Sequence, residues 1–360
     1  MIELSGQDIT LDQVWKVAYD SSASVELAAA AREKMQASKD YIQARIDTGE
    51  VMYGVNTGFG AFSNVAISRD DIVQLQKNLI RSHCAGVGPL FRKEESRAIM
   101  FLRANALARG HSGIRVEVVE KILEFLNHDV VPAIPQQGSV GASGDLAPLA
   151  HLGLALMGEG QAWSEDGGVV PVHKRLEQEN LAPLELQAKE GLSLINGCQV
   201  MTAVGLLNGS EARRLNLCLD LAGAMSLEAL RGSRRAFDPL IAATRPHPGE
   251  AKTAQNMLKL LGERSEIGES HAGCSKVQDA YSLRCIPAVH GAAKDAIRNG
   301  LQTLEVEANS STDNPLVFAE DKKVLSCGNF HGEPVAFAMD FMGIAMSAAA
   351  SISECRIEKL

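Results

Sequence analysis

The chain has 360 residues, of which 46% are hydrophobic, 22% are charged and only 4% are aromatic. This balance is that of an ordinary globular protein and excludes a disordered chain. The net charge of −9 at pH 7 argues against nucleic acid or an anionic membrane surface as the main partner, so we expect neither. Ala, Leu, Val, Ile and Met carry the apolar content, which favours helices because Ala and Leu have high helix propensity.

The seven cysteines are an odd number, stand apart along the chain and form no Cys-x-x-Cys pair. A disulfide framework would be denser and even, so we expect free thiols in a reducing compartment, and therefore a cytoplasmic protein. The N-terminus carries acidic residues too early for a secretory signal peptide. His271, Cys274, Cys285 and His290 lack the paired spacing of zinc ligands, so we expect no metal site.

Apolar periodicity predicts amphipathic helices at 70–81, 94–109 and 116–126, a long helix at 199–230 and another that begins at Pro334. Ser68 is the expected N-cap of the first of these helices. Strand material is short and lies around Val169 to Val172 and Pro315 to Leu325. Long helices normally pack antiparallel in bundles. The fold class is therefore expected to be mainly α, a long antiparallel helix bundle with a smaller mixed N-terminal region.

The most apolar long stretch, Val335 to Ile352, contains Asp340 and many small residues. These features favour a helix buried in a protein bundle over a membrane span. The helical pattern then halts at Leu360 without Gly, Pro or another end signal, so we expect a chain truncated at its C-terminus. No repeat or low-complexity linker marks a boundary. We predict a single domain, with an N-terminal region over 1–195 and an incomplete central helical bundle over 196–360.

Three glycine-rich segments interrupt the predicted helices, at 53–60 (YGVNTGFG), 138–145 (GSVGASGD) and 327–332 (CGNFHG). None of them forms a P-loop, a nucleophile elbow or a dinucleotide-binding fingerprint. Ala142-Ser143-Gly144 is small and flexible enough for the Gly144 amide nitrogen to reach the Ala142 carbonyl. Ring closure and loss of water, including the Ser143 hydroxyl, would leave an electron-poor methylidene. From these residues alone, the simpler interpretation is a Gly/Ser turn with Asp145 as the N-cap of the next helix.

The run GSVGASGDLAPLAH at 138–151 resembles the signature of the aromatic amino-acid ammonia-lyases, which build a methylidene-imidazolone (MIO) group there. The resemblance covers nearly the whole chain in the family's order and spacing: YGVNTGFG at 53, SHCAGVG at 82, KEGLSLINGCQ at 189, KVQDAYSLRC at 276, SSTDNPLVF at 310, GNFHGEPVA at 328 and SISECRIEKL at 351. It implies that Ala142, Ser143 and Gly144 form MIO as a built-in electrophile, with no diffusible cofactor.

The resemblance also implies roles for residues outside the triplet. Tyr53 matches the catalytic base that takes the β-proton, and its site must favour phenolate because a free tyrosine has a pKa of about 10. Asn196 matches a residue that contacts the electrophile and the substrate. Phe330 matches a position beside the electrophile.

Three further residues come from the block KVQDAYSLRC. Arg284 matches the residue that clamps the substrate carboxylate, a task suited to its planar fork of donors. Gln278, Tyr281 and Arg284 are spaced three apart, so on a helix they would share one face and point into one pocket. We place Tyr281 among the catalytic residues, and Gln278 with Arg284 among those that bind substrate.

His83 stands where the family reads the ring of the substrate. Histidine-specific members carry Ser-His followed by small residues there, phenylalanine-specific members carry apolar residues, and tyrosine-specific members follow the His with a bulkier residue such as Leu. The run Ser82-His83-Cys84 therefore resembles the histidine ammonia-lyases of the family. The implied reaction, a step of histidine catabolism, converts L-histidine to trans-urocanate and ammonia in a homotetramer with active sites shared between subunits.

Two departures from the family leave alternatives open. Family members continue past residue 360 and supply there an acidic residue that contacts the substrate ring, so we expect impaired activity. Cys355 also replaces the first of two arginines that the family has after Ser-Glu. The alternatives are a tyrosine or phenylalanine ammonia-lyase or an aminomutase, and, from another class, a truncated non-catalytic helical scaffold.

Overall fold

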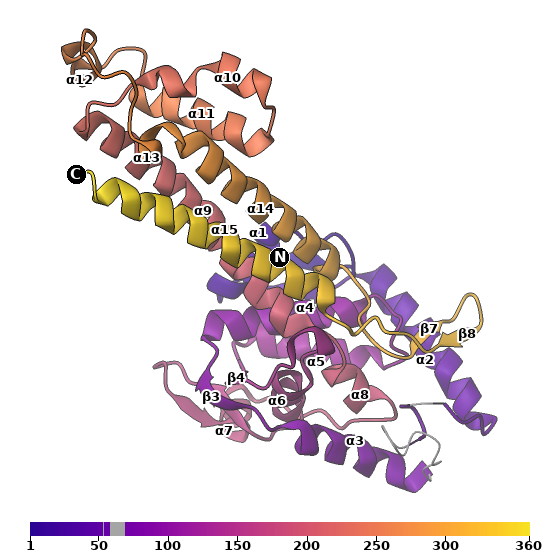
Figure 1. Cartoon of the computed structure of the whole chain (residues 1–360). Coiled ribbons are helices and arrows are strands. Elements are labelled where there is room, and N and C mark those ends of the chain that lie inside the picture. The colour runs from indigo at the N-terminus through magenta and orange to yellow at the C-terminus, as the bar shows by residue number, and fades with distance from the viewer. Residues whose placement is uncertain (53, 58–68) are drawn as a thin grey trace. The chain divides into compact units, whose positions relative to one another are not determined.

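A computed structural model of the chain describes residues 1–52, 54–57 and 69–360. The described chain forms two compact units. The first comprises Met1–Leu207 and Leu304–Ala336, and the second comprises Asn208–Thr303 and Phe337–Leu360. Helices dominate both units, and the described strands pair only in twos, so the prediction of a mainly α fold is confirmed (Figure 1). The expected single domain with a region boundary at residue 195 stays a prediction.

The first unit holds eight helices of up to 19 residues and all of the described strands. Its helices are α1 (Leu11–Tyr19), α2 (Ala29–Asp47), α3 (Arg69–His83), α4 (Lys93–Ala108), α5 (Val116–Asn127), α6 (Leu146–Leu156), α7 (Val172–Glu179) and α8 (Glu190–Ile195). A parallel pair joins β1 (Ile2–Leu4) to β2 (Val25–Leu27). Antiparallel pairs join β3 (Val87–Leu90) to β4 (Pro135–Gln137), β5 (Gln161–Trp163) to β6 (Val169–Pro171), and β7 (Leu316–Phe318) to β8 (Lys323–Leu325).

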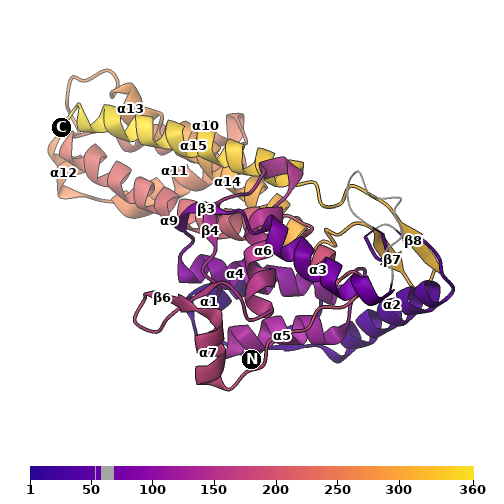
Figure 2. The same cartoon turned by 90° about the horizontal axis from the view of Figure 1, so that it is seen from below.

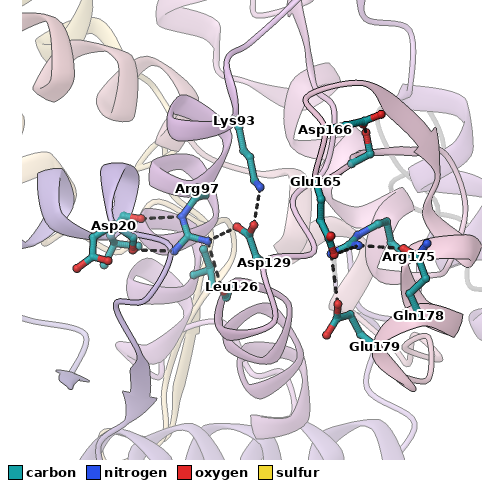
Figure 3. A network of polar contacts seen from close by, with 12 residues as sticks. Asp20, Lys93, Arg97, Leu126, Asp129, Glu165, Asp166, Arg175, Gln178 and Glu179 are labelled. Atoms are coloured by element: carbon teal, nitrogen blue, oxygen red, sulfur yellow. Dashed lines mark hydrogen bonds and ion pairs between the residues drawn. The ribbon is translucent and has the colours of Figure 1, made fainter.

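Helix α4 is the centre of the first unit, because every residue from Ser96 to Ala108 is buried. It packs against α1 and α5. Figure 3 shows the polar contacts around the buried Arg97. Its guanidinium donates to the Val17 carbonyl (2.8 Å), the Leu126 carbonyl (3.2 Å) and the Asp129 carboxylate (2.8 Å). Burial lowers the pKa of Arg97. One charged side chain therefore ties the ends of α1 and α5 to α4.

Three long helices run through the second unit side by side (Figures 1 and 2). They are α9 (Gln199–Ala229), α14 (Ile286–Ala308) and α15 (Glu333–Ile357), each of which also contributes residues to the first unit. The shorter helices are α10 (Pro239–Thr244), α11 (Pro248–Leu261), α12 (Glu266–Ser270) and α13 (Tyr281–Arg284). Leu227, Phe237, Met257 and Ile286 form the core between α9, α11 and α14.

The contacts between α9 and α14 show that these two long helices pack antiparallel. A Cβ on Gly209 of α9 would meet Leu301, whereas one on Gly223, further along α9, would meet Ile286, at the other end of α14. A Cβ on Gly300 of α14 would lie 2.8 Å from the Met342 side chain of α15, which would have to move to make room for it. The prediction of a long antiparallel helix bundle is confirmed.

The predicted helices and strands correspond to α3, α4, α5, α9, α15, β6, β7 and β8, while the expected cap Ser68 lies outside the described residues. The expectation that α15 is a buried helix is only half right. Val335 and Met342 are buried, but Phe337, Phe341 and Ile344 are 55%, 61% and 68% exposed. Among the described helices, α15 is the one that is long and apolar enough, by length and composition, to cross a membrane.

Candidate functional site

The Ala142-Ser143-Gly144 triplet lies in a tight turn before α6. Gly141–Ser143 form one turn of 3-10 helix, in which the Gly144 N–H donates to the Gly141 carbonyl (2.8 Å). Gly144 has a φ of +105°, a conformation that side-chain-bearing residues rarely adopt. A Cβ there would also lie 3.3 Å from the carbonyl oxygen of Gly197. The backbone of the turn therefore requires glycine at the third position of the triplet.

A second segment of chain contacts the carbonyl that ring closure would use. The Gly332 N–H, directly before α15, donates to the Ala142 carbonyl oxygen at 2.7 Å. A hydrogen bond to a carbonyl oxygen withdraws electron density from its carbon and stabilises negative charge that develops on the oxygen during attack. The turn thus holds the Ala142 carbonyl in a polarised state.

The side chain of Asp145 does not act as the sequence predicts. The residue occupies the N-cap position of α6, but its carboxylate makes no capping bond to that helix. Instead Oδ2 accepts the N–H groups of Val200 and Met201 (2.9 Å each), and Oδ1 accepts the Ser139 hydroxyl (2.6 Å). Burial raises the pKa of Asp145 to about 6. The expected N-cap bond is wrong because the free N–H groups in the first turn of α9 compete for the same carboxylate.

Ser143 and Gly144 line a cavity of about 280 Å³ in the first unit. The other residues that line it are Leu79, His83, Leu146, Leu192, Ile195, Asn196, Gly197, Asn314 and Phe330. Three predicted site residues, His83, Asn196 and Phe330, therefore share one cavity with the triplet. The Phe330 carbonyl oxygen lies 3.5 Å from the position of a Cβ on Gly144. The cavity combines apolar walls with a few polar groups, which is typical of small-molecule sites.

His83, the last residue of α3, lines this cavity. Its Nδ1 lies 2.9 Å from the Leu79 carbonyl oxygen and 3.1 Å from the Ser82 hydroxyl. In the tautomer in which Nδ1 donates to the carbonyl, which only accepts, Nε2 carries the lone pair. The loop that follows is held by α6, because the Gly86 N–H donates to Nε2 of His151 (3.3 Å). Burial lowers the pKa of His151, which favours the neutral form that this bond needs.

Asn196 presents a second acceptor. Its Nδ2 donates to the Asp313 carboxylate (3.1 Å) and to the Asn314 carbonyl (3.3 Å). Both partners only accept, so the nitrogen must face them and Oδ1 must face the other way. Within the described parts of the chain, Oδ1 of Asn196 accepts no hydrogen bond from the protein. The amide oxygen is therefore available to a ligand in the cavity.

Gln278, Tyr281 and Arg284 belong to the second unit, and the expectation that they share one helical face is wrong. Helix α13 begins only at Tyr281, and Gln278 precedes it in an irregular segment. The Asp279 carboxylate accepts the Ser233 N–H at 2.6 Å, which draws this segment away from a helical path. Gln278 and Arg284 nevertheless line one cavity of about 450 Å³. The Arg284 guanidinium lies 5.6 Å from the centre of the exposed Tyr281 ring.

The remaining predicted base, Tyr53, lies outside the described residues. Among the residues that the structure describes, no three His, Cys, Asp or Glu side chains are grouped to hold a metal ion. Sequence reasoning missed Asn314, which lines the cavity, and the pair of Lys189 and Asp313 behind Asn196. These residues fall in the blocks KEGLSLINGCQ and SSTDNPLVF, but no local pattern joins two charges that lie over a hundred positions apart.

The family model for aromatic amino acid lyases matches residues 9–360. The chain belongs to the aromatic amino acid lyase family. It is 48% identical over 360 residues to the histidine ammonia-lyase of Myxococcus xanthus (strain DK1622), an alignment that covers all of this chain and 70% of that protein. The structure is similar to that of histidine ammonia-lyase from Trypanosoma cruzi, with a TM-score of 0.90 and 40% identity over 99% of this chain and 66% of that chain. It is also similar to tyrosine aminomutase from Streptomyces globisporus, with a TM-score of 0.91 and 38% identity over 99% and 70% of the two chains.

Membership of the aromatic amino acid lyase family confirms the resemblance inferred from the sequence motifs. It also confirms that the chain is a carbon–nitrogen lyase of the ammonia-lyase type. The family is known for the MIO electrophile, and the Ala142-Ser143-Gly144 triplet stands in a glycine-dependent turn at the edge of the cavity. The residues present therefore fit the group that the family uses.

Proposed function

We propose that this chain eliminates ammonia from L-histidine to give trans-urocanate. The observation that carries the proposal is that His83 and Asn196 share one cavity with Ser143 and Gly144. Asn196 offers Oδ1 as an acceptor, and His83 offers Nε2 when its Nδ1 donates to the Leu79 carbonyl. L-Histidine brings two matching donors, a ring N–H and an ammonium group. A phenyl ring brings no donor, so a phenylalanine substrate would leave the His83 acceptor without a partner, which is unfavourable in a buried site.

The MIO group formed from Ala142, Ser143 and Gly144 would supply an electrophile for the amino group of the substrate, without a diffusible cofactor. For its formation, the Gly144 nitrogen bonds to the Ala142 carbonyl carbon, and the Ala142 oxygen and the Ser143 hydroxyl leave as two waters. The Gly332 N–H polarises the carbonyl that is attacked. Asp145 fixes the turn by its bonds to the start of α9.

The remaining predicted residues keep the roles that the family resemblance implies. Arg284 binds the substrate carboxylate, and its cavity also holds Arg231, Arg235 and Lys276, a cationic environment that suits an anion. Gln278 and Tyr281 act with Arg284 on the substrate, and Tyr53 takes the β-proton.

We also propose a homotetramer with active sites shared between subunits, in the cytoplasm. Exposed apolar side chains on the long helices support association. Leu217, Leu221 and Met225 recur every fourth residue along α9, and Phe337, Phe341 and Ile344 line one stripe of α15. Such rows on a monomer indicate a surface that another chain covers. All seven cysteines are free, as a reducing compartment requires.

The test adds L-histidine to the purified protein and follows the absorbance of urocanate, with Ser143→Ala as the matched control. We expect urocanate from the parent and none from the variant, because the variant has no hydroxyl to eliminate. Intact mass should show the parent two waters lighter than its sequence and Ser143→Ala without that loss. A parent that carries the mass loss but releases no urocanate would contradict histidine as the substrate.

L-Tyrosine is the second candidate substrate, because its phenol O–H could also donate to Nε2 of His83 and because a tyrosine aminomutase has a similar structure. The same assay with L-tyrosine, read at the absorbance of coumarate and by chromatography for β-tyrosine, distinguishes the two. A parent with neither activity and an unshifted mass would favour the non-catalytic scaffold.

A further inference from the structure

Behind Asn196 lies a buried ion pair that the proposed chemistry does not use. Lys189, at the N-cap of α8, is fully buried, and its Nζ donates to Oδ2 of Asp313 at 2.7 Å. The Ser193 hydroxyl donates to the same oxygen at 2.9 Å. A buried ion pair seldom adds stability over apolar side chains of the same size, because both charges lose their hydration. The pair therefore calls for an explanation other than stability.

The other carboxylate oxygen of Asp313 faces the site. Oδ1 accepts the Asn196 side-chain amide (3.1 Å) and the backbone N–H of Asn314 (2.7 Å). Burial acts to raise the pKa of Asp313, but the Lys189 ammonium, together with Arg103 and a hydrogen bond from Ser112, holds the pKa below the usual value. Asp313 thus stays ionised and only accepts hydrogen bonds. A protonated Asp313 could donate instead, and only the Asn314 carbonyl would then hold the Asn196 amide in this orientation.

The charge on Asp313 therefore decides which end of the Asn196 amide faces the cavity. A flipped amide would place its oxygen against the Asp313 carboxylate and the Asn314 carbonyl, which loses two hydrogen bonds and adds two repulsive contacts. The backbone of Asn196 is held separately, because Arg103 donates to the Asn196 carbonyl oxygen (3.0 Å). Side chain and main chain are both fixed, with Nδ2 on Asp313 and Asn314 and Oδ1 directed away from them, in a residue that lines the cavity with Ser143 and Gly144.

We propose that Asp313 and Lys189 are positioning residues that hold the Asn196 amide oxygen toward the cavity, so that the site selects ligands that carry an amino group. The proposal rests on the proposed function, in which the substrate amine approaches Ser143. Neither residue lines the cavity. Their effect is confined to the orientation of Asn196.

The experiment compares the binding of two ligands by calorimetry, in a Ser143→Ala background that cannot turn over. L-Histidine carries an amino group, whereas imidazole-4-propionate has the same ring and carboxylate without it. Asp313→Asn offers Asn196 either a donor or an acceptor, so only the weaker bond to the Asn314 carbonyl still favours the present orientation of the amide. We expect affinity for L-histidine to fall by about 10- to 100-fold, the value of one hydrogen bond to a charged group, while affinity for imidazole-4-propionate changes by less than about 2-fold.

Two further variants separate positioning from loss of structure. Glu190→Gln is the matched control, because Glu190, on α8, is also a fully buried carboxylate, paired with Arg115 at 2.7 Å and with no bond to Asn196. It should lower the melting temperature and leave the ratio of the two affinities unchanged. The Lys189→Met/Asp313→Asn double variant leaves no unpaired buried ammonium, so it decides the question if Asp313→Asn fails to fold.

The proposal is overturned if both ligands weaken in parallel in the Asp313 variants, or if Glu190→Gln shifts the affinity ratio by as much. Equal binding of L-histidine by the parent and the variants would overturn it as well. Failure of the proposed function is a separate result: the protein with Ser143 intact would then bind L-histidine and release no urocanate.

Discussion

Asp145 is the buried carboxylate that ties the triplet turn to α9, and two substitutions separate its charge from its hydrogen bonds. Asp145→Asn keeps an oxygen for the N–H groups of Val200 and Met201, and the Ser139 hydroxyl can rotate to accept from the new amide. Asp145→Ala removes all three bonds. The first variant therefore tests ionisation alone, and the second tests the tie to α9.

The magnitude follows from the pKa of Asp145, which burial raises from 3.8 to about 6. Because the folded chain holds this proton more tightly than the unfolded chain, stability falls as pH rises from 3.8 through 6 and is level above that. The whole change is about 3 kcal/mol at about 1.36 kcal/mol per pH unit, and about 1.5 kcal/mol of it falls between pH 5 and pH 8. Asn does not titrate, so Asp145→Asn lacks this slope.

Urea unfolding of the parent and both variants at pH 5, 6.5 and 8 measures the effect. We expect the free energy of unfolding of Asp145→Asn to gain about 1.5 kcal/mol relative to the parent over that range. Asp145→Ala should be about 2–4 kcal/mol less stable than Asp145→Asn at pH 8, because two N–H groups in the first turn of α9 lose their acceptor. A parent-to-Asn difference that stays constant with pH would refute the assigned cost of ionisation.

Two further predictions concern buried charges away from the cavity. Arg97→Met should lower the free energy of unfolding by about 3 kcal/mol, since it removes the buried bond to the Val17 carbonyl and breaks the pair with the partly exposed Asp129. A loss below about 1 kcal/mol in urea unfolding would contradict this. His290 donates from Nδ1 to Asp220 (2.9 Å) and accepts at Nε2 from Arg356 (3.3 Å), so it must be neutral. Burial lowers its pKa below 6.5, and the stability that it adds is therefore complete above pH 6.5 and lost as pH falls through the lower value. The stability advantage of the parent over His290→Gln should shrink between pH 7.5 and pH 5.5 in thermal unfolding, and an advantage independent of pH would count against a neutral His290.

Helix α14 shows why part of the fold escaped prediction. Its sequence contains Pro287, Gly291 and Gly300, residues that interrupt a helical pattern when only the sequence is visible. In the structure the two glycines are sites of close approach. A Cβ on Gly291 would lie 2.4 Å from the Glu250 nitrogen, and one on Gly300 would lie 2.8 Å from Met342. The helices that were predicted, such as α5, have an uninterrupted apolar period and need no knowledge of their neighbours.

The residues of the candidate site also fall into two groups, those that sequence motifs predicted and those that only the structure shows. His83, Asn196 and Phe330 were named from motifs, and they line one cavity with Ser143 and Gly144. The side-chain bonds of Asp145 to α9 were missed because the sequence does not show that the N–H groups at the start of α9 lie next to this carboxylate. They bind it in place of the N–H groups of α6, the helix that follows Asp145 in the sequence. Asp313 was missed because its partner Lys189 is remote in the sequence. The three-residue spacing of Gln278, Tyr281 and Arg284 suggested one helix, yet α13 begins only at Tyr281. The Asp279 side chain, before that helix, accepts a hydrogen bond from the Ser233 N–H.

The cavity residues show one physical pattern, which is that acceptors behind the cavity take up their hydrogen-bond donors. Asp313 accepts the side-chain amide of Asn196, and the Leu79 carbonyl lies where it can accept the Nδ1 hydrogen of His83. What remains toward the ligand is an acceptor atom from each residue. The polarity of the cavity is thus set by groups that never touch its contents, and a substrate is selected by the donors it brings. A motif names the residues that line such a site, whereas only the contacts behind them determine whether those residues donate or accept.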